Sequence, residues 1–398
     1  MTRTEIIDAA FRVWGRNFYK KTSLSQLAGE LKVSKPALYR HFESKKDLTA
    51  AMIERFSDDF SDFVRGDFQR ALQTDDADKG IITVVGSISG FFARNAYLLI
   101  FSLMNIYDRN LDGRAMMEKL KSRGVDMAVL RTVTEKKYNS DITHVRLIFA
   151  TLTFFMSNFH KNKKALETPL SDGDIEAITS NICSTVLHGL NFPPDKAQID
   201  FDKLEKKIET NLPHFQSEPF FKAVAEAVAE TGPWEVTMDM IAKKLGLSKS
   251  SLYGHFKNKK DMLRRLFTTE FKKIMGFARQ GISQSDKATE QLFLGILSIA
   301  VYFRSHNEIL VAMDWIRTRK LDIGRPDKNM EIFRLFEDVD IEPLRSESEE
   351  KKQAVSHWIL FLLINILTHP DGSAANVQNN GIRLLYKYII SGLGGFIK

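Results

Sequence analysis

Cysteine is nearly absent from this sequence, since Cys183 is the only one among 398 residues. A single thiol excludes an intrachain disulfide, and nothing in the cysteine usage points to an oxidising compartment. The N-terminal residues include no apolar signal region. The longest apolar run, about residues 358–367, is shorter than the roughly 18–20 residues that a membrane-spanning helix requires. We therefore expect a soluble, cytoplasmic protein with no membrane partner.

Motifs that carry catalysis or bind metal ions are missing as well. The sequence has no P-loop, no Gly-rich dinucleotide turn, no HExxH and no Cys/His cluster at metal-ligand spacing. We therefore expect no enzymatic activity, no metal and no cofactor. Hydrophobic residues make up 43% of the chain, which favours two or three folded domains over disorder.

What the sequence does contain is a long internal repeat. Residues 33–48 read VSKPALYRHFESKKDL, and residues 247–262 read LSKSSLYGHFKNKKDM, with nine of sixteen positions identical at a constant offset of 214. Solenoid repeats are roughly 20–50 residues long, so this spacing indicates a duplicated domain instead.

Both copies have the pattern of two short helices joined by a tight turn. In the first copy Ser23 precedes an apolar stripe at i, i+3, i+4 and i+7, and Ser34 precedes a second helix anchored by Leu38 and Phe42. A third helix begins after Ser44, with Asp47 predicted as its capping-box partner. Thr237, Ser248, Leu252, Phe256, Asn258 and Asp261 take the same places in the second copy.

Positive charge is concentrated in the same two segments. Residues 32–46 hold five basic residues and one acid, and residues 243–260 hold six basic residues and no acid, against a net charge of +7 for the whole chain. A basic surface on a helix-turn-helix pattern is typical of a phosphate-binding face. A pair of ordinary helical hairpins with Lys-rich tips is the alternative explanation.

The doubled pattern resembles the DNA-binding domain of TetR-family (tetracycline-repressor type) transcription regulators. The resemblance covers about 45 residues in each copy and implies that the helices at 35–41 and 249–255 are recognition helices. The family has Gly in the turn before this helix; the second copy keeps Gly246, whereas the first has Lys32. A non-Gly residue at positive φ costs roughly 1 kcal/mol, so we expect slight strain at Lys32.

The resemblance also implies which side chains contact DNA. In the first copy these are Thr22, Ser23, Ser34, Lys35, Pro36, Ala37, Tyr39, Arg40, His41 and Lys45. In the second copy they are Thr237, Ser248, Lys249, Ser250, Ser251, Tyr253, His255 and Lys259. Arg40 can read guanine or contact phosphate, whereas its counterpart Gly254 can make no side-chain contact. We therefore predict a double-stranded DNA operator with two non-identical half-sites.

The similarity between the halves extends beyond the two heads, so the chain resembles two complete regulators fused in tandem. We predict an all-α fold with a head at 1–48, a helical regulatory domain at 49–192, a linker at 193–217, a second head at 218–262 and a second regulatory domain at 263–398. Residues 204–212 have a helical apolar spacing inside the linker.

The resemblance further implies a small apolar or amphipathic effector bound in the regulatory domains. The candidate ligand-binding residues are Phe92, Phe101, Met104, Tyr107, Phe303, Met313 and Trp315. Ordinary core packing is the competing explanation for each of these residues.

We interpret the chain as an effector-responsive repressor that acts as an intrachain pseudo-dimer. A homodimer that presents four heads is the alternative assembly. Two other functions stay open: a non-specific architectural DNA-binding protein, and a protein-interaction adaptor built on TetR folds.

Overall fold

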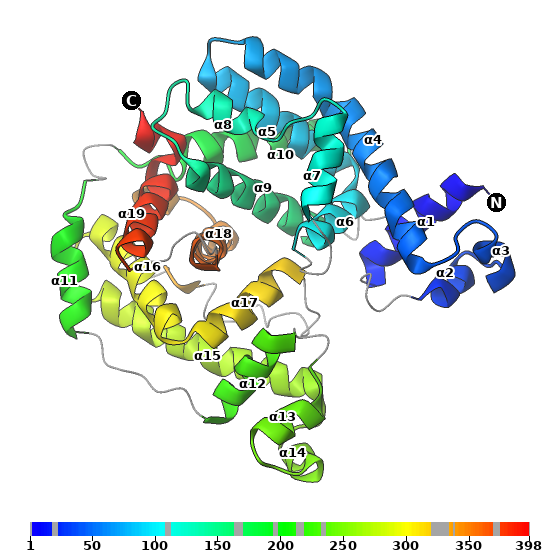
Figure 1. The fold of residues 1–398 in the computed structure, drawn as a ribbon. Coiled ribbons are helices and arrows are strands. Elements are labelled where there is room, and N and C mark those ends of the chain that lie inside the picture. The colour runs from blue at the N-terminus through cyan, green and yellow to red at the C-terminus, as the bar shows by residue number, and fades with distance from the viewer. Residues whose placement is uncertain are drawn as a thin grey trace. The chain divides into compact units, whose positions relative to one another are not determined.

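The computed structural model describes residues 2–17, 23–107, 113–162, 170–193, 198–211, 219–231, 236–319, 334–336, 339–368 and 375–397. Regular secondary structure in these ranges is entirely helical (Figure 1). The chain divides into two compact units, Met1–Val186 with Ile397–Lys398, and Leu187–Phe396. The predicted all-α fold class and its tandem arrangement are confirmed.

The first unit contains a head followed by a helical bundle. Its helices are α1 (Arg3–Asn17), α2 (Leu24–Glu30), α3 (Lys35–Tyr39), α4 (Lys45–Gln73), α5 (Ala77–Arg94), α6 (Ala96–Tyr107), α7 (Gly113–Ser122), α8 (Val129–Thr134), α9 (Ile142–Asn162) and α10 (Asp172–His188). Among the described residues no single helix is long and apolar enough to cross a membrane, although α5 and Ala96–Leu103 pass that test as a pair bent by 110°.

The second unit repeats the plan after one additional helix. Its helices are α11 (Phe201–Asn211), α12 (Pro219–Thr231), α13 (Met238–Lys244), α14 (Lys249–His255), α15 (Lys259–Ile282), α16 (Ala288–Ser305), α17 (Asn307–Arg319), α18 (Glu349–Thr368) and α19 (Ala375–Ser391). Short 3-10 helices are formed by Glu342–Leu344 and Gly392–Phe396. The helices α4 and α15 run without a break across residues 48 and 262, so each head is continuous with the bundle that follows it (Figure 1).

An aromatic cluster joins the head of the first unit to its bundle. The ring of Phe11 on α1 meets the ring of Phe101 on α6 edge-on, with centroids 4.9 Å apart. Phe101 in turn lies 5.9 Å from Phe56 on α4, whose ring stacks on Phe60 and Phe92. In the second unit α12 packs against α17 in the corresponding way. The first helix of each head is therefore supported by the bundle.

The core of the second unit contains a buried carboxylate. Glu270 on α15 is fully buried; it accepts a hydrogen bond of 2.5 Å from the Tyr302 hydroxyl and pairs with Lys273 Nζ at 2.8 Å. Burial and the neighbouring carboxylate raise the pKa of Tyr302. A buried charge is tolerated when it is paired and hydrogen-bonded, as here.

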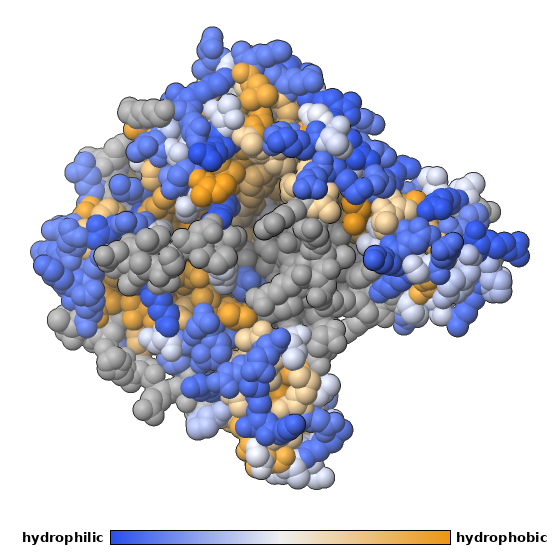
Figure 2. Space-filling view, viewed as in Figure 1, coloured by the Kyte–Doolittle hydropathy of each residue, from blue (hydrophilic) through white to orange (hydrophobic). Residues whose placement is uncertain are grey.

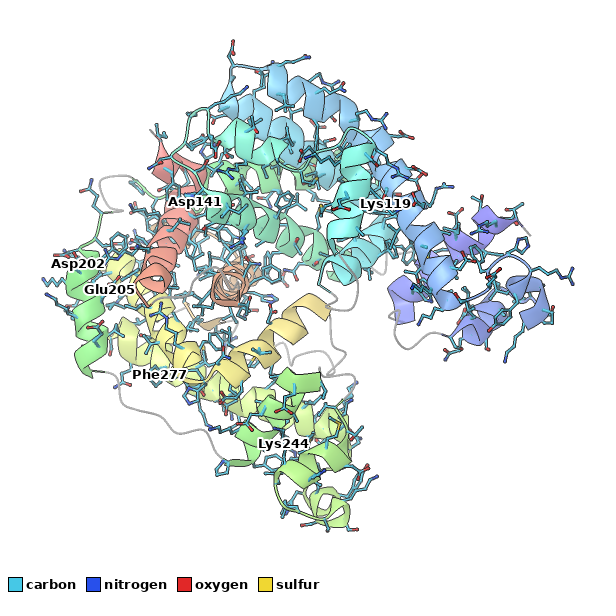
Figure 3. All side chains as sticks on the ribbon, in the orientation of Figure 1. Lys119, Asp141, Asp202, Glu205, Lys244 and Phe277 are labelled. Carbon is cyan, nitrogen blue, oxygen red and sulfur yellow. The ribbon has the colours of Figure 1, made fainter. Side chains whose placement is uncertain are left out.

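The helix α11 forms where the sequence predicts helical structure within the linker, and it belongs to the second unit. Leu204 and Ile208 are 1% exposed, and the ring of Phe201 packs edge-on against Phe293 on α16 at 4.9 Å. Arg383 on α19 pairs with both Asp202 and Glu205 of α11, at 2.5 and 2.7 Å. Figure 3 labels the two acidic residues on α11. This part of the linker is thus packed into the second bundle.

Candidate nucleic-acid interface

The first head presents one short helix to solvent. The helix α3 begins after Ser34, whose hydroxyl accepts a hydrogen bond of 3.3 Å from the Ala37 amide. Leu38 is completely buried and holds the helix against the head, whereas Tyr39 is 48% exposed. Ser34, Lys35, Pro36, Tyr39 and Arg40 are exposed, and Ala37, His41 and Lys45 are half-buried.

The second head has the same local geometry. Ser248 caps α14 by accepting a hydrogen bond of 3.1 Å from the Ser251 amide, and Leu252 is the buried anchor. Tyr253 is 47% exposed, in agreement with Tyr39. Thr237, Ser248, Lys249, Ser250, Ser251, Tyr253 and His255 are exposed, and Lys259 is half-buried. Each head therefore exposes corresponding side chains on the outer face of its short helix. Figure 2 shows hydrophilic residues over much of the visible surface of the first head at the right.

The N-termini of the neighbouring helices are capped as well. Ser23 and Gln26 form a reciprocal capping box at the start of α2, which the sequence analysis did not identify. Thr22 lies outside the described residues. Ser44 accepts from the Asp47 amide at 3.1 Å as predicted. The predicted capping box at this helix is incorrect in one detail, because the Asp47 carboxylate accepts from the Glu43 amide, one residue before the cap.

The lysines that begin the third helix of each head partly face the protein. The Lys45 ammonium lies 5.7 Å from the centre of the Trp14 ring, and burial lowers the pKa of Lys45. Lys259 Nζ donates a hydrogen bond of 2.8 Å to the Val236 carbonyl. Both lysines therefore hold the head together on one side while remaining half-exposed on the other.

The turn between the two short helices has the conformation expected from the sequence. Lys32 has φ of 55° and Gly246 has φ of 65°. The amide of the following residue donates back across the turn in both heads, Val33 to the Ala28 carbonyl at 3.0 Å and Leu247 to the Ala242 carbonyl at 2.9 Å. This six-to-one hydrogen bond is the Schellman arrangement that ends a helix.

Ion pairs distinguish the second head from the first. Lys249 Nζ on α14 lies 2.9 Å from Asp239 on α13, and this carboxylate raises the pKa of Lys249. Lys244 pairs with Glu230 of α12 at 2.7 Å. Neither pair is predictable from helical periodicity, because neither has an i, i+3 or i+4 spacing. The signal in the sequence is the difference in charge between equivalent positions of the two heads.

The predicted ligand-binding residues lie in tightly packed regions where their side chains are described. Phe92, Phe101, Phe303 and Met313 are each at most 8% exposed. The side chains of Met104, Tyr107 and Trp315 lie outside the described residues. Their proposed contact with an effector therefore stays a prediction.

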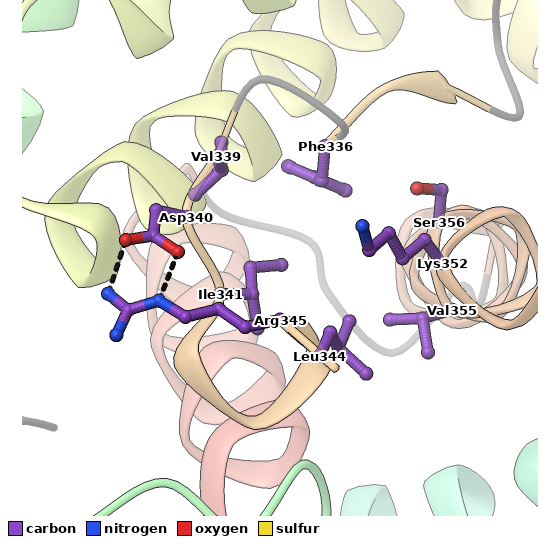
Figure 4. Close-up of a pocket in the computed structure, with 9 residues that line it drawn as sticks. All are labelled: Phe336, Val339, Asp340, Ile341, Leu344, Arg345, Lys352, Val355 and Ser356. Atoms are coloured by element: carbon purple, nitrogen blue, oxygen red, sulfur yellow. Dashed lines mark hydrogen bonds and ion pairs between the residues drawn. The ribbon is translucent and has the colours of Figure 1, made fainter. Parts of the chain in front are cut away.

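A cavity of about 260 Å³ lies elsewhere in the second unit, where Phe336 and residues 339–345 face α18 (Figure 4). Phe336, Val339, Ile341, Leu344 and Val355 supply its apolar lining. Its cations are already paired, Arg345 with Asp340 in a two-pronged contact and Lys352 with Glu349 at 3.0 Å. Of the predicted ligand-binding residues whose side chains are described, Phe92, Phe101, Phe303 and Met313, none lines this cavity.

Among the described residues no group of three or more His, Cys, Asp or Glu side chains could hold a metal ion. The thiol of Cys183 is buried beside the Ile82 carbonyl, and burial raises its pKa to about 11. A thiol with a raised pKa is a poor nucleophile at neutral pH.

Comparison with known proteins identifies both heads. Residues 6–52 and 221–266 each match the family described as bacterial regulatory proteins, tetR family. The fatty acid metabolism regulator protein of Bacillus subtilis is 28% identical over 102 residues, which cover 25% of this chain and 53% of that protein. The HTH-type transcriptional repressor NicS of Pseudomonas putida is 24% identical over 185 residues, 44% of this chain and 85% of that protein. The chain thus spans about half the length of the first of these relatives.

Solved structures of transcriptional regulators align with less than half of this chain. The TetR family regulator PfmR from Thermus thermophilus has a TM-score of 0.34 and 19% identity, covering 45% of this chain and 95% of that one. The regulator FadR from Bacillus subtilis, solved with stearoyl-CoA, has a TM-score of 0.35 and 18% identity, covering 46% and 97%.

Proposed function

We propose that this tandem TetR-family chain is a sequence-specific regulator of transcription whose two heads contact two unlike half-sites of one DNA operator. The observation that carries the proposal is the pair of short capped helices, α3 and α14, which expose Tyr39 and Tyr253 to the same extent. Exposed basic and hydroxyl-bearing side chains accompany both tyrosines: Ser34, Lys35 and Arg40 in the first head, and Ser248, Lys249, Ser250 and Ser251 in the second. Retention of this face in both copies favours DNA binding over an adaptor role.

Each recognition helix would enter a major groove with its N-terminal side chains toward the bases. Pro36, Ala37 and Arg40 in the first head, against Ser250 and Ser251 in the second, would set two different base preferences. The remaining predicted contacts would fix the register through phosphates without reading sequence, as backbone contacts generally do. The half-exposed Lys45 and Lys259 are part of this second group.

Repression that an effector relieves is the form of regulation that we propose. A molecule that separated α6 from α1, or α17 from α12, would displace a head relative to its bundle. The contact between Phe11 and Phe101 supports such coupling in the first unit. The Bacillus subtilis relative is named a fatty acid metabolism regulator, so long-chain acyl compounds are the first effectors to test.

One chain already carries two heads, so we propose that it acts as an intrachain pseudo-dimer. Measuring the mass of the protein–DNA complex tests this: one chain per operator supports it, and two chains would indicate the four-headed homodimer.

Selection of bound sequences from a random DNA pool tests the function itself, with full-length protein at physiological salt. We expect two different half-sites at a fixed spacing near one helical turn or a multiple of it. Binding without enrichment would indicate an architectural protein, because purely phosphate-driven binding does not discriminate between sequences. An absence of binding, with and without acyl effectors, would indicate an adaptor.

A further inference from the structure

We infer that the two heads bind DNA unequally, because Asp239 neutralises the recognition helix of the second head and leaves the first head to supply most of the phosphate-driven affinity. This inference rests on the proposed DNA-binding function. It concerns the strength of each head, which duplication by itself would make equal.

The contact lies on the face assigned to DNA. Asp239 is in the first turn of α13, two residues after the cap Thr237, and Lys249 is the first residue of α14. Their side chains are 62% and 54% exposed and meet at 2.9 Å. The carboxylate therefore stands beside the N-terminal end of the recognition helix, where a phosphate would approach.

The first head has a neutral residue at the position of this carboxylate. With the repeat offset of 214, Lys249 corresponds to Lys35, and Asp239 corresponds to Ser25. Lys35 is exposed at the start of α3, in the same place relative to its cap. The lysine that both heads share is thus accompanied by a neutral residue, Ser25, in the first head and by an acid, Asp239, in the second.

The consequence does not depend on how long the ion pair persists. An exposed pair of this kind is weak, so Lys249 can exchange Asp239 for a phosphate. The Asp239 carboxylate then remains close to that phosphate and repels it. In either arrangement the two side chains have no net charge, whereas Lys35 and Ser25 together carry one positive charge.

The charge of the whole head follows the same trend. Residues 2–48 contain ten Lys and Arg against five Asp and Glu, whereas the equivalent residues 216–262 contain seven against six. The net charges are therefore +5 and +1. Part of the difference comes from Glu226 and Glu230, which stand where the first head has Arg12 and Arg16. A larger positive charge increases both affinity and the rate of association with DNA.

Unequal DNA affinity of the two heads would affect how the protein discriminates between operators. The first head would anchor the protein on DNA, and the second would add affinity only where its half-site makes good base contacts. Discrimination between operators would then depend mainly on the second half-site, because a weak head cannot hold an unsuitable sequence through phosphates alone.

The test compares full-length wild-type protein with Asp239→Ser, which introduces the residue of the first head, on an operator obtained by selection. Binding is followed by fluorescence anisotropy between 0.1 and 0.3 M salt. The matched control is Asp286→Ser, which removes the same charge from an exposed residue beyond the far end of α15. That site is about 36 Å along the helix from the head, far outside a Debye length of about 8 Å.

We expect Asp239→Ser to increase the affinity about three- to tenfold at 0.15 M salt, and to steepen the dependence of log K on log salt by about 0.9, the value of one added phosphate contact. Ser25→Asp should lower the affinity by a similar factor, and Asp286→Ser should match the wild type. Circular dichroism melting of each variant checks that the heads stay folded.

Equal binding by Asp239→Ser and Asp286→Ser would overturn this inference while leaving the proposed function intact. A wild-type protein that bound no DNA under any condition would instead refute the proposed function, and this inference with it.

Discussion

Lys32 and Gly246 occupy the same turn of the two heads and share a left-handed backbone, with φ of 55° and 65°. The glycine adopts this conformation at no steric cost, whereas the lysine brings a Cβ atom into a region that L residues avoid. The first head therefore contains a small strain that the second does not have.

Substitutions at these two positions should change stability in opposite directions, raising that of the first head and lowering that of the second. Lys32→Gly should stabilise the first head by about 0.5–1 kcal/mol, and Gly246→Ala should destabilise the second by about 1 kcal/mol. The loss of stability in Gly246→Ala would come from the backbone conformation and not from a steric clash, because a Cβ atom at Gly246 would meet no atom within 4 Å. Hydrogen exchange of the amides in α2 and α13 measures the local opening energy. A loss of protection in Lys32→Gly would contradict the explanation.

Recognition residues should separate into two classes when they are changed. The double change Pro36→Ser with Ala37→Ser gives the first head two residues of the second, so its selected half-site should shift toward that of the second head. Tyr39→Phe and Lys45→Met should weaken binding to all sequences alike, because phosphate contacts carry no base information. Selection repeated with each variant measures both effects. An unchanged half-site in the double variant, with affinity retained, would show that these positions do not contact bases.

Arg383 should anchor the linker helix to the second bundle. Arg383→Ala removes the cation that lies 2.7 Å from Glu205, which is 9% exposed, and the loss of a hydrogen bond to such a buried group costs about 1–3 kcal/mol. The matched control is Arg345→Ala, which breaks a similar two-pronged pair with Asp340 at an exposed site and should have a much smaller effect. Thermal melting and hydrogen exchange of α11 measure the difference. Equal effects of the two variants would contradict a structural role for the α11 contact.

Acid should weaken the start of α9 through Asp141. This carboxylate lies 2.9 Å from Nδ1 of the His144 ring and accepts a hydrogen bond of 2.8 Å from the Thr143 amide, and the His144 contact is the main reason that its pKa falls to about 2. A lowered pKa means that the stabilisation is present above the unfolded value, about 3.9, and disappears as pH falls toward 2.

The variant Asp141→Asn should therefore be less stable than the wild type at pH 5 to 7, and the difference should vanish near pH 2. Because the Asp141 side chain is 61% exposed, water screens the contact and the loss should be about 1 kcal/mol. Urea unfolding followed by circular dichroism at each pH gives the comparison. A constant difference at all pH values would assign the effect to packing instead.

Much of the architecture could be predicted from the sequence because it depends on neighbours along the chain. Helix caps such as Ser34 and Ser248 act on amides three residues away, and anchors such as Leu38 and Leu252 follow from helical spacing. The left-handed turn at Lys32 was predictable for the same reason. These features specify the two heads, the all-α fold and the exposed helices proposed to contact DNA.

Tertiary structure alone determined the contacts between distant segments. Arg383 and Glu205 are 178 residues apart, and only the packing of α11 on the second bundle brings them together. The pairing of Asp239 with Lys249 depends on the angle between two short helices, which no periodicity encodes. The sequence determines the charge of each side chain, whereas the fold determines which partner neutralises it. The reason is that an electrostatic interaction depends on distance in space and not on separation along the chain.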